Sequence, residues 1–86
     1  PSGAGRSPTT TISFSISEKS EVELTVYNIK GQKIKTLVKD KIDVGNHSVI
    51  WIGDDENRKP VSSGVYFYIL NVNGKDEAVK KCLLLK

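Results

Sequence analysis

The sequence predicts an all-β fold, an antiparallel β-sandwich of about seven short strands. Apolar and polar residues alternate over several short segments, as expected for strands that bury one face. Turn-forming residues interrupt these segments about every eight to twelve residues. No segment shows the periodicity of an amphipathic helix. Together these observations favour two packed sheets over any helical architecture.

Composition allows a single domain and excludes several kinds of site. The chain has 86 residues, enough for one modest core. Its only cysteine, Cys82, excludes an intrachain disulfide and a multi-cysteine metal site. The net charge is +3, but the lysines are dispersed and no arginine cluster accompanies them. We interpret them as a solubilising surface that protects strand edges, and we expect no nucleic-acid partner.

Residues 1–7 differ from the rest of the chain in composition and periodicity. Residues 1–7 are small, include glycine and proline, and have no periodicity, so we interpret them as a linker or an engineered remnant. The domain is expected to span residues 8–86. No apolar run reaches the length of a membrane span and no signal peptide opens the chain, so we expect a soluble module without membrane insertion, taken from a longer protein.

Three strands are predicted in the first half. In residues 9–17 the apolar side chains are Ile12, Phe14 and Ile16, at period two. Residues 22–28 alternate in the same way. Gly31 then supplies the positive φ that a hairpin needs. Residues 33–38 alternate imperfectly, which indicates a bulge or an edge strand.

The next strand rises after the turn at residues 45–46. We expect Trp51 at its end to lie in the core, near Phe14 or Phe67, because exposing an indole is costly. His47 is the only histidine and has no nucleophile motif beside it, so a structural or surface role is favoured and no catalytic site is expected.

A long polar segment, residues 53–64, contains the sequence DDEN. Its oxygen ligands would suit calcium, but the spacing of a calcium loop fails. We therefore predict a turn, with no metal and no cofactor.

The fifth strand is expected over residues 62–72, where Ser62, Ser63 and Gly64 lead into a run that is apolar on both faces, which predicts a central strand. Val65, Phe67 and Ile69 share one face, and Tyr66 and Tyr68 lie on the other. We interpret the two tyrosines as residues of the core or its margin, with a contact surface for bases or sugars as the alternative.

Asn73-Gly74 predicts a hairpin into the last strand, in which Leu83 and Leu85 are expected to face the core. A terminal apolar strand can also be offered to a receptor by strand addition, since chain ends are the least constrained part of a domain.

Five segments occur in a familiar order: SPTTTISFSI, VELTVYNIKGQKIKTLV, GNHSVIWIG, PVSSGVYFYIL and KKCLLLK. In order and spacing the chain resembles, over residues 8–86, the type IX secretion system C-terminal sorting domains. These are similar in turn to the immunoglobulin-like domain of the flagellar hook-capping protein. The resemblance implies an immunoglobulin- or fibronectin-like sandwich that is not an enzyme.

The resemblance also implies a function, that of an export signal on a larger secreted protein. The implied partners are the outer-membrane secretion machinery and an upstream catalytic or adhesive domain of the same chain. The implied destination is the cell surface or the medium, by way of the periplasm of a Gram-negative bacterium. The residues expected to be recognised are Gly64, Val65, Tyr66, Lys80, Lys81, Leu83, Leu84, Leu85 and Lys86. The alternative is a passive spacer or a carbohydrate-facing accessory module of a secreted hydrolase.

Overall fold

A computed structural model describes residues 9–84, so the predicted linker, Pro8, Leu85 and Lys86 lie outside the described residues. Within this range the chain forms six strands: β1 (Thr10–Ile16), β2 (Ser20–Asn28), β3 (Lys33–Ile42), β4 (Gly45–Trp51), β5 (Gly64–Val72) and β6 (Lys75–Leu84). The all-β prediction is confirmed, with six strands rather than about seven. The described part of the chain contains no helix long and apolar enough to cross a membrane.

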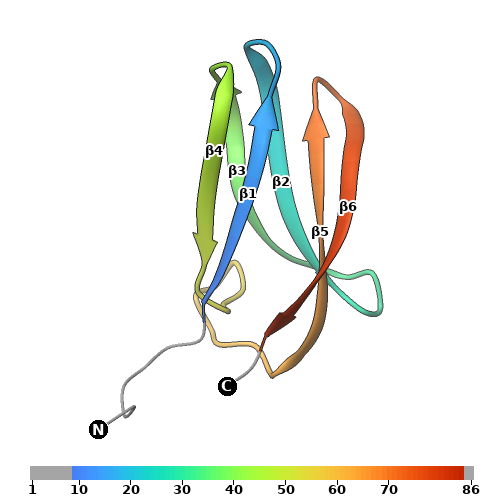
Figure 1. The fold of residues 1–86 in the computed structure, drawn as a ribbon. Helices are drawn as coiled ribbons and strands as arrows, with labels where there is room; N and C mark the ends of the chain where they lie inside the picture. The colour runs from blue at the N-terminus through green and yellow to red at the C-terminus, as the bar shows by residue number, and fades with distance from the viewer. Residues whose placement is uncertain (1–8, 85–86) are drawn as a thin grey trace, which may run out of the picture.

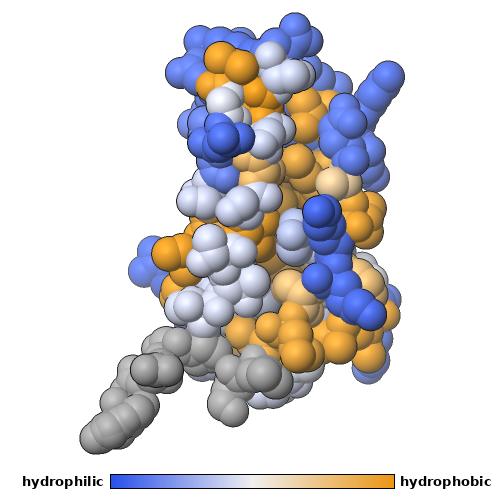
Figure 2. All heavy atoms as spheres, in the orientation of Figure 1, coloured by the Kyte–Doolittle hydropathy of each residue, from blue (hydrophilic) through white to orange (hydrophobic). Residues whose placement is uncertain are grey.

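The strands form two antiparallel sheets that pack face to face. One sheet pairs β1 with β4, and the other has the order β3-β2-β5-β6. Figure 1 shows β1 and β4 in front of the larger sheet. Figure 2 shows the outward surface of β1 as pale, weakly polar atoms, because its outward positions are serine and threonine. The predicted inner position of the fifth strand is confirmed, since β5 lies between β2 and β6.

Alternation along the strands places the core between the sheets. On β2, the side chains of Val22, Leu24 and Val26 are almost fully buried. They pack with Ile12 and Ile16 of β1 and with the inward residues of β5. Each of these side chains contributes roughly 1.5–3 kcal/mol through the apolar surface that it removes from water.

Turns and the edge strand agree with the sequence. Asn73 and Gly74 have φ values of 53° and 86°, the left-handed conformations that a two-residue hairpin turn requires. β3 is an edge strand, and its register with β2 shifts twice, so the predicted bulge or edge is confirmed in both senses.

Trp51 is fully buried, as predicted, but its predicted neighbours are wrong. Its ring meets Tyr66 edge-on, with centroids 5.1 Å apart, and its Nε1 donates a hydrogen bond of 2.9 Å to the carbonyl oxygen of Asp54. Phe14 instead stacks on His47, with centroids 5.6 Å apart. Phe67 has the opposite parity from Tyr66 and therefore lies on the outer face of the larger sheet.

Candidate functional site

The pairing of β5 with β6 brings most of the predicted recognition residues together. Gly64 lies opposite Leu84, and Val65 lies opposite Leu83. Lys80 and Lys81 follow on β6, and both are exposed. Gly64 has a φ of 155°, which side chains rarely adopt, although a Cβ there would meet no atom within 4 Å. Leu85 and Lys86, also predicted, lie outside the described residues.

The last strand faces the core with the opposite parity from the one predicted. Leu83 is 57% exposed, whereas Leu84 is 1% exposed. The register explains this, because directly paired residues of an antiparallel sheet share a face. Tyr66 and Leu70 point into the core, so their partners Cys82 and Ala78 do so too, and Leu84 follows at period two. The expectation that Leu83 is a core residue is therefore wrong.

Apolar side chains gather on the outer face of the larger sheet, around the β5–β6 pair. We call these side chains the outer patch; they are Val65, Phe67 and Ile69 of β5 and Val79 and Leu83 of β6. Exposed fractions are 62% for Val79, 57% for Leu83 and 36% for Val65. Lys81, opposite Phe67, lies in the middle. Sequence reasoning missed the patch as a unit, although the apolar character of both faces of β5 was its signal.

Tyr66 and Tyr68 are core and margin residues, as predicted. Tyr66 is 5% exposed, and its hydroxyl donates a hydrogen bond of 2.6 Å to the carbonyl oxygen of Ser62. Tyr68 is half-buried and packs against both parts of the core. With its ring against Trp51, Tyr66 has no free face on which a sugar or base could stack.

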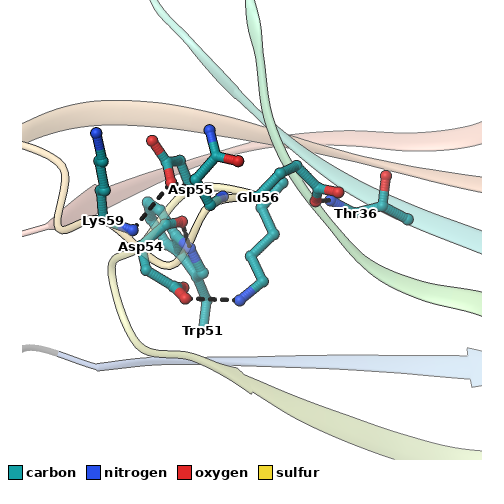
Figure 3. Close-up of polar contacts among 8 residues, drawn as sticks. Thr36, Trp51, Asp54, Asp55, Glu56 and Lys59 are labelled. Carbon is teal, nitrogen blue, oxygen red and sulfur yellow. Dashed lines mark hydrogen bonds and ion pairs between the residues drawn. The ribbon is translucent and has the colours of Figure 1, made fainter.

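The acidic loop uses its carboxylates within the protein (Figure 3). Asp54 is buried, and its Oδ2 lies 2.7 Å from Nζ of Lys35. Asp55 Oδ1 accepts hydrogen bonds from the backbone N–H groups of Asn57 and Lys59, a turn that aspartate commonly forms. Glu56 Oε1 accepts a hydrogen bond of 2.6 Å from the N–H of Thr36. The predicted turn is confirmed, and each carboxylate has a structural partner.

This geometry predicts that the stability of the domain does not depend on metal. A ligand that binds only the folded state raises its stability. We expect the melting temperature to be the same with a chelator and with about millimolar calcium, because the acids of the described loop already have partners within the protein. Differential scanning fluorimetry checks this. A rise of several degrees with calcium would mean that the acids of the loop bind the ion.

The two remaining reactive side chains sit in structural surroundings. Nε2 of His47 lies 2.7 Å from the carbonyl oxygen of Asp43, and the ring stacks on Phe14. Burial raises the pKa of the Cys82 thiol above its usual value, which disfavours the nucleophilic thiolate. Among residues 9–84, no three histidine, cysteine, aspartate or glutamate side chains converge as a metal site.

Two comparisons with known proteins find matches. A family model described as "CHU_C Type IX secretion signal domain" matches residues 1–85. Among solved structures, FlgD from P. aeruginosa superposes with a TM-score of 0.66 at 23% identity, over 88% of this chain and 61% of that one. The chain thus spans less than two thirds of that structure, and the likeness establishes a shared sandwich fold. No curated protein matches the sequence.

Proposed function

Because the chain belongs to the family of CHU_C type IX secretion signal domains, we propose that it is the C-terminal module of a larger secreted protein and directs that protein across the outer membrane. The domain is a non-catalytic sorting signal that interacts with the secretion machinery and serves export to the cell surface or the medium. We further propose that the cargo passes through the periplasm and that the secretion machinery recognises the β5–β6 hairpin.

The observation that carries the second part is the exposure of the end of this hairpin. Leu83 is a large apolar side chain that the fold leaves largely in water, beside Val65. Lys81 lies on the same face as Leu83, and Lys80, opposite Tyr68, is exposed on the other face of the same edge strand. Exposed apolar residues with a charged rim are typical of surfaces that bind another protein. The fold needs neither the exposed leucine nor the lysines for its core, which supports a role in recognition.

A secretion assay tests the proposal. Residues 8–86 are fused to a reporter that carries a signal peptide, in a host with type IX machinery, and the reporter is measured in the medium and in the periplasm. We expect export of the intact fusion. The triple variant Lys80→Glu/Lys81→Glu/Lys86→Glu is expected to reduce export about tenfold or more, because reversing charges at an interface opposes binding.

The matched control reverses three exposed lysines elsewhere, in Lys30→Glu/Lys39→Glu/Lys41→Glu, and should leave export unchanged. Charge reversal is a cleaner test than deleting residues 81–86, since the deletion also removes Leu84 from the core. An intact fusion that folds normally yet stays in the periplasm would contradict the proposal and leave the passive spacer in its place.

A further inference from the structure

The two edge strands of the four-stranded sheet, β3 and β6, differ in whether another described segment contacts their outer edge. At the β3 edge, Glu56 behaves like one residue of an added strand. Its N–H donates a hydrogen bond of 3.1 Å to the carbonyl oxygen of Ile34, and its carboxylate accepts from the N–H of Thr36 (Figure 3). The carbonyl oxygen of Ile34 and the N–H of Thr36, on either side of Lys35, therefore both have hydrogen-bond partners in the loop.

At the opposite edge, no described segment covers β6. Within residues 9–84, β6 pairs with β5 alone, and Figure 1 shows it at the rim of the sheet. An uncovered edge strand presents a row of unpaired N–H and C=O groups to another strand. The strand is long, from Lys75 to Leu84, so this edge offers pairing positions over its whole length.

Side chains along this edge define what a neighbouring strand would meet. On the outer face, Val79, Lys81 and Leu83 alternate as apolar, basic, apolar. The first and last are more than half exposed. A strand added to β6 would place its own outward side chains beside these three.

We propose that the open edge of β6 binds an extended segment of a partner protein by strand addition, and that this segment presents an acidic side chain between two apolar ones at alternate positions. The inference rests on the proposed function, since the partner would be part of the secretion machinery. Backbone hydrogen bonds to β6 supply affinity, and the acid opposite Lys81 supplies register and selectivity.

Charge favours an acidic partner over a second copy of this chain. Residues 78–84 contain two lysines and no acid. Two copies paired antiparallel over these residues would set Lys81 against Lys81, and like charges directly opposite are destabilising. Lysines on an exposed edge are a common device against self-association. The same lysine attracts an acidic strand, so the edge discriminates between partners.

Peptide titration followed by NMR tests the inference on the 86-residue chain. The probe is the heptapeptide Ser-Val-Thr-Glu-Thr-Val-Ser, titrated to about millimolar concentration, at which a dissociation constant of about 1 mM is detectable. We expect shifts confined to the backbone amides of β6 and the outer patch. Lysine in place of the central glutamate should weaken binding about five- to tenfold, and Lys81→Glu should reverse the preference between the two peptides. Lys33→Glu, exposed on the other edge strand, is the matched control and should change nothing.

Several results would overturn the inference. One is undiminished binding of both members of a peptide pair, N-methylated at the odd-numbered and at the even-numbered amides, since one of these two sets of N–H groups must face β6 in an added strand. Another is the absence of any shift with the acidic peptide, and a third is a concentration-dependent dimer without peptide, which would make the second copy the occupant. Failure of this inference and of the proposed function are distinguishable. If Lys81→Glu abolishes peptide binding while export persists, strand addition at β6 is not how the signal is read, although the chain is still a signal. If the intact fusion is not exported, the export proposal fails whatever the peptide does.

Discussion

Replacing Trp51 with alanine is expected to lower the free energy of unfolding by about 3–5 kcal/mol. The indole is fully buried, contacts Tyr66 edge-on and joins β4 to the core formed with Val26 and Leu84. Alanine would leave a cavity there and would remove the hydrogen bond from Nε1 to the carbonyl oxygen of Asp54. Because a small domain has only about 5–15 kcal/mol of stability in total, we expect a large fall in melting temperature.

Urea unfolding followed by far-ultraviolet circular dichroism measures this loss, since the variant has no tryptophan to report by fluorescence. Ile50→Ala is the matched control. It lies next to Trp51 on the same strand, its side chain is 58% exposed, and its loss should cost much less. A wild-type emission maximum like that of fully solvated tryptophan would contradict the burial, as would a loss below about 1 kcal/mol in Trp51→Ala.

Strand positions and hairpins were predictable because they follow from local chemistry. Alternation at Val22, Leu24 and Val26 needs only the period of a strand, and Asn73-Gly74 needs only the left-handed conformations of a tight turn. Alternation alone leaves the buried face undetermined where both faces are apolar. That is the case in the last strand, whose run of three leucines fits either parity.

The candidate site depended on long-range register, which no local pattern specifies. Leu84 faces the core because Cys82 pairs with Tyr66, a residue on a different strand of the hairpin. The outer patch likewise needs β5 and β6 in register before Phe67 and Lys81 become neighbours. The resemblance to sorting domains indicated the correct hairpin, but the residues that face outward on it required the structure.

The sequence also does not predict that the acidic loop covers the edge of β3. From the sequence, the acids of the polar segment 53–64 are interpreted as turn formers or weak metal ligands, and Asp55 does form a turn. Asp54 and Glu56, however, find partners on β3, about 20 residues earlier in the chain. Because the spacing between a loop acid and a strand lysine is arbitrary, nothing in the sequence pairs Lys35 with Asp54.

Replacing Lys35 with methionine is expected to destabilise the domain by about 2–4 kcal/mol. Removing one partner of a buried ion pair costs roughly 3–5 kcal/mol, because the other charge is left unpaired, whereas an exposed pair is worth about 0–1 kcal/mol. This pair lies nearer the buried limit, since the Asp54 side chain is 7% exposed and that of Lys35 is 26% exposed. Oδ1 of Asp54 has no hydrogen-bond partner among the described residues, so Lys35 is its main compensation.

The matched control is Lys33→Met, an exposed lysine two positions away on the same strand, and its effect should stay within about 0.5 kcal/mol. The double variant Lys35→Met/Asp54→Leu should recover most of the loss, because it removes the unpaired charge together with its partner. Chemical denaturation measures the four proteins. Amide hydrogen exchange at Thr36 adds a local readout, since a loop released from Lys35 should also release Glu56 from the β3 edge. If Lys35→Met is as stable as Lys33→Met and Thr36 stays protected, the ion pair does not hold the loop on β3, and the backbone contact between Glu56 and Ile34 must suffice.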